Sequence, residues 1–293
     1  MLQMNNISKR FGAFQALEDL TMQVPTGAVY GLVGPNGAGK STSIRVLTGV
    51  YRPDSGNVTL DGAPIYENPA AKQRMCCIPD EIFYFPSATM EEMCRFYGGI
   101  YPRFDRALYE RLHEAFRLPA KSPIRRFSKG MQKQAAFQLS LCCRPEVLIL
   151  DEPVDGLDPV MRRQVWSLLM SDVAQEGTTV LISSHNLREL EDICDHVGIM
   201  DHGKMLLERS LADLQGNVVK LQIVGDTPAG LDILHESGSG RLRTLIVRGS
   251  AEAVQAAAAA SQSAYFDVLP LSLEEIFIYE LGGVNDDVRN ILL

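Results

Sequence analysis

Residues 34–42 of the chain are Gly34-Pro35-Asn36-Gly37-Ala38-Gly39-Lys40-Ser41-Thr42, and they match every fixed position of the phosphate-binding pattern G-x-x-x-x-G-K-[ST]. The residues before this loop, 29–33, are mostly apolar and predict a buried strand. The segment from Ser41 to Thr48 predicts a helix that ends at Gly49. The loop therefore joins a strand to a helix, which is the context that the pattern requires.

The residue types in this loop suit the binding of a polyphosphate. Glycines allow backbone N–H groups to turn inward, and the N-terminus of the following helix favours negative charge. Lys40 supplies a positive charge for the β- and γ-phosphates, and the Ser41 hydroxyl is a hard oxygen ligand for Mg²⁺. By chance alone, a glycine-rich turn would match this pattern in about one per cent of chains of this length. We predict that ATP is bound by Asn36, Gly37, Ala38, Gly39, Lys40, Ser41 and Thr42.

The composition is that of an ordinary folded protein. The chain has 293 residues, 46% of them hydrophobic and 22% charged, and a net charge of −8. The negative charge and the lack of a long basic run argue against a nucleic-acid partner. No uninterrupted apolar segment reaches the roughly 18 residues that span a bilayer, and the N-terminus lacks the apolar core of a signal peptide. We therefore expect any membrane role to depend on a partner.

The six cysteines do not form a recognisable metal or redox motif. Cys76 and Cys77 are adjacent, as are Cys142 and Cys143, and no C-x-x-C spacing occurs. Adjacent cysteines pair poorly with each other. We interpret the cysteines as reduced thiols that act as small core residues, with a metal or redox site as the less favoured alternative.

Short apolar runs alternate with helical segments over most of the chain. Val147–Leu150, Thr179–Ser183 and Val197–Met200 predict buried strands, with helices between and after them, including one at Leu187–Cys194. This alternation predicts an α/β fold with a mainly parallel sheet. Before the phosphate loop, Leu2–Met4 and other short runs predict an antiparallel N-terminal subdomain.

Two further regions differ from this alternating pattern. Residues from about 80 to 145 are mostly helical and form a helical insert, in which Thr89 and Glu92 predict a capping box. Residues 1–216 therefore form one large domain. Residues 217–284 predict a small α+β domain without a motif that carries chemistry, and residues 285–293 predict a mobile tail.

Polar residues follow two of the predicted strands. Asp151 and Glu152 come directly after one strand, and His185 follows the next. In an open α/β sheet, ligands collect at the carboxyl ends of the strands. ATP hydrolysis needs a carboxylate for the metal and a base for the attacking water. We predict that Asp151 holds the metal, that Glu152 acts as the base and that His185 contacts the γ-phosphate.

A second anion-binding helix start is predicted at residues 127–132. Ser128 and Gly130 precede a helix with free backbone donors. Two such helix starts cannot both surround one triphosphate from the same side. We therefore expect Ser128 and Gly130 to contact ATP that is bound by another subunit.

The order of the motifs GPNGAGKST, FSKGM, LILDEPVDGLDP and SSH resembles that of the ATP-binding subunits of ABC transporters, over residues 1 to about 215. This resemblance implies a P-loop NTPase (RecA-like) fold and an ATPase that dimerises on ATP and drives a separate permease. It implies that Asp158 crosses the dimer interface. The implied signature for the partner's ATP site is Ser128, Lys129, Gly130 and Met131, in which Lys129 and Met131 replace commoner residues.

The resemblance also bears on two residues whose roles the pattern alone leaves open. Phe11 is either a satellite core residue or an aromatic that stacks on the nucleobase, and the resemblance favours stacking on adenine. Asp80 stands where the family usually has glutamine in the sensing loop. Aspartate is shorter and charged, so Asp80 is predicted as an additional contact to Mg²⁺ or water together with Ser41 and Asp151.

Finer similarities connect the chain to subunits of ABC-2 type permeases, mostly exporters, and among these to YtrB-like subunits. These similarities include the sequence S-K-G-M at residues 128–131 and residues 271–277. The expected location is the cytoplasmic face of the cell membrane, as a peripheral subunit in a homodimer or heterodimer. The segment Phe83-Tyr84-Phe85-Pro86 is either core of the insert or part of a groove for a permease helix; we predict the groove, with at most two of the three aromatics buried.

Two other functions are less favoured. A soluble ABC ATPase acting on ribosomes or nucleic acid usually has two cassettes or basic surfaces, whereas this chain has one phosphate loop and a negative net charge. A regulator that binds ATP without hydrolysis would not need Glu152 and His185. The absence of an N-K-x-D base-reading motif argues against a GTPase.

Overall fold

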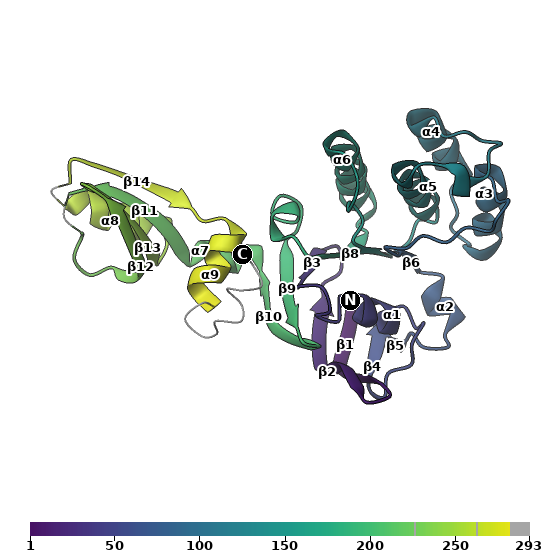
Figure 1. Cartoon of the computed structure of the whole chain (residues 1–293), viewed down its shortest axis with the longest axis horizontal. Helices are drawn as coiled ribbons and strands as arrows, with labels where there is room; N and C mark the ends of the chain where they lie inside the picture. The colour runs from purple at the N-terminus through teal and green to yellow at the C-terminus, as the bar shows by residue number, and fades with distance from the viewer. Residues whose placement is uncertain (226, 262, 282–293) are drawn as a thin grey trace. The chain divides into compact units, whose positions relative to one another are not determined.

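The computed structural model describes residues 1–225, 227–261 and 263–281 (Figure 1). The chain divides into two compact units. The first consists of Met1–His185 and His196–Glu208, and the second of Asn186–Asp195 and the chain from Arg209 onward. The predicted mobile tail lies outside the described residues.

The first unit is built on a six-stranded sheet. Its strands are β3 Val29–Val33, β6 Met75–Ile78, β7 Val147–Asp151, β8 Thr179–Ser184, β9 His196–Asp201 and β10 Lys204–Ser210. They are paired in the order β10-β9-β3-β8-β7-β6. Strand β3 pairs in parallel with β8 and β9, and β7 pairs in parallel with β6 and β8. All residues of β3, β7 and β8 are buried, as expected for strands covered on both faces. The predicted mainly parallel α/β fold is confirmed.

An antiparallel sheet forms the N-terminal part of the first unit. Its strands are β1 Leu2–Phe11, β2 Phe14–Val24, β4 Ser55–Leu60 and β5 Ala63–Pro64, in the order β2-β1-β4-β5. Helix α1 (Lys40–Leu47) follows the phosphate loop. One apolar core joins Met4 of β1, Tyr30 of β3, Ile44 of α1 and Leu181 of β8. The phosphate loop is therefore anchored on both sides by buried elements.

Helix α2 (Pro69–Lys72) precedes β6, and further helices occupy the interval between β6 and β7. They are α3 Met90–Ile100, α4 Arg106–Phe116, η1 Ile124–Arg126 and α5 Lys129–Cys142. The predicted capping box is present, because the Glu92 N–H donates to the Thr89 hydroxyl and the Thr89 N–H donates to the Glu92 carboxylate. Ser128 caps α5. Helix α5 and helix α6 (Pro159–Glu176) lie on the opposite side of the large sheet from α1 (Figure 1).

The predicted α-helix at Leu187–Cys194 is wrong. The structure has only a short 3-10 helix there, η2 Leu187–Glu189, followed by turns. Leu190 donates its N–H to the Leu187 carbonyl, and Ile193 donates to the Leu190 carbonyl. These i→i+3 bonds are those of 3-10 geometry, which buries the apolar residues without an α-helix.

The second unit contains an antiparallel sheet. Its strands are β11 Val218–Val224, β12 Asp232–Ser239, β13 Leu242–Arg248 and β14 Tyr265–Pro270, in the order β12-β13-β11-β14. Helix α8 (Ala251–Ala260) covers one face and shares an apolar core with the sheet. Helices α7 (Leu211–Gly216) and α9 (Leu273–Leu281) complete the unit. The sequence pattern missed β12, because this edge strand lacks a regular apolar alternation.

Candidate functional site

The phosphate loop connects β3 to α1 and is shaped by its glycines and by Lys40. Gly37 and Gly39 have φ of 87° and 104°, a backbone conformation that glycine adopts without steric cost. The Lys40 side chain is buried, and its Nζ donates hydrogen bonds to the Gly34 carbonyl at 2.6 Å and the Pro35 carbonyl at 3.3 Å. The ammonium therefore lies inside the loop, where it can neutralise a bound phosphate.

A cavity of about 280 Å³ opens beside the phosphate loop. Side chains from three separate parts of the first unit line it, namely the hairpin β1–β2, the segment after β6 and the end of β7. Ala38 is not among the lining residues, because its side chain is buried in the core beneath the loop. The predicted site residues that line the cavity are Asn36, Gly37, Gly39, Lys40, Ser41, Thr42, Asp80 and Glu152.

Glu152 lies between Lys40 and His185. Its Oε1 is 3.4 Å from Lys40 Nζ, and its Oε2 is 3.0 Å from His185 Nδ1. The carboxylate is mostly buried, whereas the His185 ring is partly exposed. Three residues from separate motifs are thus brought together at one end of the sheet. This arrangement can orient a water molecule beside a phosphate held by Lys40.

Asp151 and Glu152 are neighbours in sequence but have different surroundings. Asp151 is buried at the end of β7, and its Oδ1 accepts a hydrogen bond of 2.5 Å from the Ser183 hydroxyl. Glu152 has a φ of 46°, a left-handed conformation that is rare for residues other than glycine. This backbone turn directs the two carboxylates differently, so they can serve different functions.

The oxygen donors near the phosphate loop suit Mg²⁺. Ser41, Asp80 and Asp151 line a neighbouring cavity of about 580 Å³, so a hydroxyl and two carboxylates face one space. Mg²⁺ is usually held by one or two carboxylates together with substrate phosphates, rather than by a cage of protein ligands. Within the described part of the chain, no group of three His, Cys, Asp or Glu side chains is arranged to hold a metal by itself.

Phe14 is the aromatic residue that lines the cavity beside the phosphate loop. Phe14 is exposed and contributes to the cavity wall together with Ala16. Phe11 pairs with Phe14 across the hairpin, but its ring packs edge-on against Tyr51 at 5.2 Å between centroids, and Lys9 Nζ lies over it. Stacking of Phe11 on adenine stays a prediction, and the geometry favours Phe14 for this role.

Replacing Phe14 with alanine should weaken ATP binding about tenfold, because stacking of a base on an aromatic ring is removed. Binding of inorganic tripolyphosphate, which has no base, should not change. Titration of parent, Phe14→Ala and Phe11→Ala with both ligands measures this. Loss of ATP affinity in Phe11→Ala alone would assign the stacking to Phe11 instead.

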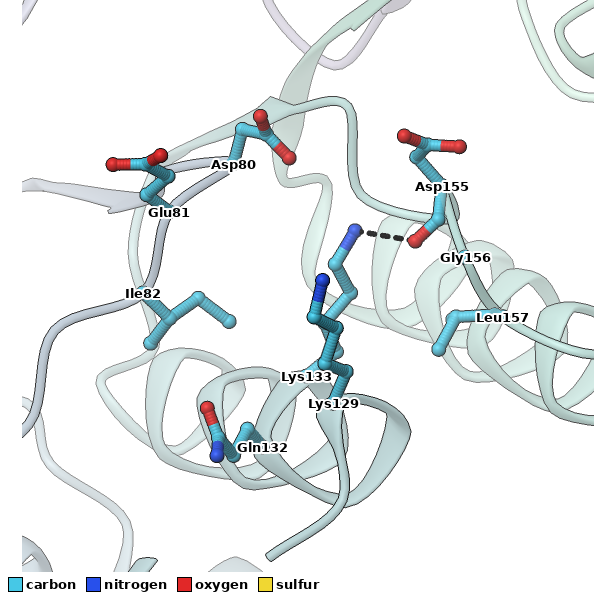
Figure 2. A pocket seen from close by; sticks show the side chains of 9 residues that line it. All are labelled: Asp80, Glu81, Ile82, Lys129, Gln132, Lys133, Asp155, Gly156 and Leu157. Atoms are coloured by element: carbon cyan, nitrogen blue, oxygen red, sulfur yellow. Dashed lines mark hydrogen bonds between the residues drawn. The ribbon is translucent and has the colours of Figure 1, made fainter. Parts of the chain in front are cut away.

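Of the signature residues, Lys129 lines a different cavity. This cavity, of about 490 Å³, is at the start of α5 and is lined by Lys129, Lys133 and Asp80, among others (Figure 2). Ser128 accepts a hydrogen bond from the Met131 N–H at 3.3 Å, as an N-cap. Residues 128–131 are not part of the cavity wall at the phosphate loop. The structure therefore does not bring the signature to this chain's own Lys40, and its contact with ATP of another subunit stays a prediction.

Asp158 has a structural role at the start of α6. It is the N-cap of α6, and its Oδ1 accepts hydrogen bonds from the N–H groups of Val160 and Met161, both at 3.0 Å. The neighbouring Val160 is highly exposed. The crossing of a dimer interface by Asp158 stays a prediction.

The segment after β6 presents an aromatic surface. Phe83 is 79% exposed and Phe85 is 50% exposed, whereas Tyr84 is buried at 8%. The Phe85 ring also contacts Phe96 of α3, which is exposed in turn. The Tyr84 hydroxyl donates to the Gln132 carbonyl at 3.2 Å, and burial raises the pKa of Tyr84. The prediction that at most two of the three aromatics are buried is confirmed.

Two residues of the site were missed by the sequence reasoning. Phe14 was overlooked although it follows the turn after Phe11 and is just as aromatic. Lys133 lies one turn into α5 and donates to two carbonyls near Glu152. The sequence around Lys133 gives no sign that this side chain is buried at the site, because a lysine is normally solvent-exposed.

Comparison with known proteins gives consistent similarities. Residues 17–155 match the family model described as ABC transporter. The chain is 30% identical to the ABC transporter ATP-binding protein YtrB of Bacillus subtilis (strain 168), over 97% of this chain and 99% of that protein. It is 34% identical to the linearmycin resistance ATP-binding protein LnrL of the same strain, over 79% and 76%. A solved ATP-binding subunit of an ABC transporter superposes with a TM-score of 0.68 and 30% identity, covering 73% of this chain and 92% of that one.

Proposed function

Because this chain belongs to the ABC transporter family, as an ATP-binding subunit that hydrolyses ATP, we propose that it energises a separate ABC-2 type permease that exports its cargo. Subunits of this family form dimers and work with transmembrane permeases. Export is supported by the resemblance to subunits of ABC-2 type permeases. The name of LnrL, which refers to linearmycin resistance, also fits export.

The observation that carries the proposal is the convergence of Lys40, Glu152 and His185, of which Lys40 and Glu152 line the cavity at the phosphate loop and His185 contacts Glu152. In this arrangement Lys40 neutralises the β- and γ-phosphates of ATP. Glu152 accepts a proton from the attacking water, and His185 orients the Glu152 carboxylate and contacts the γ-phosphate.

Mg²⁺ would be held by Ser41 and Asp151, with Asp80 as a further contact. A bound ion would neutralise negative charge on the phosphates. The hydrogen bond from the Ser183 hydroxyl supports this assignment, because it orients the buried Asp151 carboxylate. Asp80 lines the cavities at the phosphate loop and at α5, so its carboxylate lies close to both.

The signature residues would complete the ATP site of a second subunit. Ser128, Lys129, Gly130 and Met131 are at the N-terminal end of α5, where backbone donors and the helix dipole favour an anion. Lys129 adds a positive charge at this end. Residues 128–131 do not line the cavity at Lys40, which supports a shared site in which ATP lies between two subunits.

The permease would dock on the aromatic surface formed by Phe83, Phe85 and Phe96. Exposed aromatic residues are frequent anchors in protein interfaces. The cavity of about 580 Å³ next to Asp80 is lined in part by Ile44 and Val50, which adds apolar wall close to the sensing loop. A permease helix bound at the aromatic surface would therefore lie near the nucleotide. No helix within the described residues is long and apolar enough to span a bilayer, and we propose a peripheral location at the cytoplasmic face of the membrane.

The docking proposal is tested by Phe83→Asp, alone and with Phe85→Asp. A charge placed in an apolar interface should lower the amount of permease that co-purifies from detergent-solubilised membranes at least about tenfold. The unfolding temperature should not change, because both side chains are exposed. Tyr84 is unsuitable for this test, because its burial would make a charged substitution disrupt the fold.

Tyr66→Asp serves as the matched control, since Tyr66 is also an exposed aromatic of the first unit. It should leave the recovery of permease unchanged. If the double variant Phe83→Asp, Phe85→Asp still retains its permease at the parental level, the aromatic surface is not the docking site. Mass spectrometry of the material bound by the parent identifies the permease itself.

A further inference from the structure

Lys133 is a buried lysine beside the proposed catalytic residues. It lies on α5, one turn after the Ser128 cap, and it is 8% exposed. Its Nζ donates hydrogen bonds to the carbonyl of Glu152 at 2.9 Å and to the carbonyl of Asp155 at 2.8 Å. Figure 2 shows the side chain extending from α5 to the Asp155 carbonyl. A buried ammonium group is tolerated only with such partners. The two hydrogen bonds therefore hold α5 and the Glu152–Asp155 turn together.

The turn that Lys133 holds has an unfavourable backbone conformation. Glu152 has a φ of 46°, and such left-handed residues persist only where the surroundings impose them. On one side, the Glu152 N–H donates to the Ser183 hydroxyl at 3.1 Å. On the other, the Glu152 carbonyl accepts from Lys133. Removing the second contact would allow the turn to relax, and the Glu152 side chain would move with it.

The surroundings of Lys133 lower its pKa, with burial as the largest cause. The carboxylates of Asp80, Asp155 and Glu152 act in the opposite direction, and Lys129 adds to the lowering. The ammonium has three N–H donors, of which two are directed at the carbonyls of the turn. It thereby connects the helix that begins with the signature to the turn that follows β7.

We propose that Lys133 is a positioning residue for ATP hydrolysis, which holds the Glu152–Asp155 turn so that the Glu152 carboxylate stays between Lys40 and His185. This inference rests on the proposed role of Glu152 as the base. Lys133 acts through the backbone of the turn, because its hydrogen bonds go to the carbonyls of Glu152 and Asp155. Displacement of a reacting group by about 1 Å can reduce a rate about 100-fold, so a small relaxation of the turn is sufficient for a large loss of activity.

The test compares Lys133→Met, Lys133→Gln and Lys133→Arg. Methionine has a long unbranched side chain without donors, glutamine keeps shorter neutral donors, and arginine keeps charged donors. In Lys133→Met we expect kcat to fall about 10- to 100-fold, while the affinity for N-methylanthraniloyl-ATP stays within about threefold of the parent. Lys133→Arg should recover part of kcat. A fall in kcat without loss of ATP affinity, with rescue by arginine, is not expected from general damage to the fold.

Lys72→Met is the matched control, because Lys72 also donates to a backbone carbonyl, that of Gly49 at 3.0 Å, but away from Glu152. Its kcat should stay near that of the parent. The proposal is overturned if Lys133→Met keeps parental kcat, or if kcat and ATP affinity fall together. If Lys133→Met does not fold, Lys133→Gln and Lys133→Arg are compared with the parent instead. A kcat equal to that of the parent in both variants then overturns the proposal.

Glu152→Gln is measured in parallel to separate this inference from the proposed function. If Glu152→Gln keeps parental turnover, the role of Glu152 as the base fails, and the positioning role of Lys133 fails with it. If Glu152→Gln loses turnover while Lys133→Met keeps it, only the positioning role is wrong. Loss of kcat in both variants, with ATP affinity retained in both, supports both assignments.

Discussion

Glu152→Gln is expected to bind ATP but to hydrolyse it at least about 100-fold more slowly than the parent, because the amide cannot accept the proton of the attacking water. The amide has nearly the shape of the carboxylate, so the contacts to Lys40 and His185 can be kept. Loss of the negative charge beside Lys40 also removes repulsion toward the phosphates. ATP affinity should therefore be equal to that of the parent or higher.

Phosphate release measures the turnover of Glu152→Gln, and size-exclusion chromatography with MgATP measures its association. With hydrolysis blocked, the variant should accumulate as an ATP-bound dimer, as a site shared between two subunits requires. Glu110→Gln is the control, since Glu110 is an exposed residue of α4 that pairs with Arg106. Parental turnover in Glu152→Gln would transfer the role of the base to another carboxylate, with Asp80 and Glu81 as the next candidates.

Lys40→Ala should bind ATP about 10- to 100-fold more weakly than the parent, because a charged hydrogen-bond donor to the phosphates is lost. The actual loss should lie toward the upper end of this range. Without Lys40, the Glu152 carboxylate faces the phosphates with no cation between them. The hydrogen bonds from Lys40 to the Gly34 and Pro35 carbonyls, which hold the loop, are lost as well.

Isothermal titration with MgATP measures this effect. Lys204→Ala is the control, because Lys204 is an exposed lysine that pairs with Glu18 at the surface. Lys40→Arg retains the charge and should bind ATP better than Lys40→Ala, although the larger planar group fits the loop less well. Equal ATP affinity of Lys40→Ala and the parent would contradict the assignment of this loop as the ATP site.

The features that were predicted correctly depend on residues that are close together in the sequence. The phosphate loop, the buried strands β7 and β8 and the capping box at Thr89 are each written in a few consecutive positions. The carboxyl ends of parallel strands meet at one edge of a sheet, so Glu152 and His185 could be placed together before any coordinates were known. The family resemblance that followed from these motifs is confirmed by the comparisons.

The prediction failed where turns and sheet edges decided the outcome. The segment from Leu187 to Cys194 has apolar residues at a spacing that suits both an α-helix and 3-10 turns, and the structure has the turns. Strand β12 lies at the edge of its sheet. Its sequence, DILHESGS, lacks the regular alternation of apolar and polar residues that indicates a strand.

Contacts between distant segments determine the remaining features of the site. Phe11 and Phe14 are opposite each other in one hairpin, yet the packing of Phe11 on Tyr51 leaves Phe14 at the cavity. Tyr84 is buried between two exposed phenylalanines because its hydroxyl reaches the Gln132 carbonyl. Lys133 is buried because the carbonyls of a turn about 20 residues further along the chain accept its hydrogen bonds. Local patterns describe which residues prefer burial, whereas the partners that satisfy a buried polar group come from elsewhere in the folded chain.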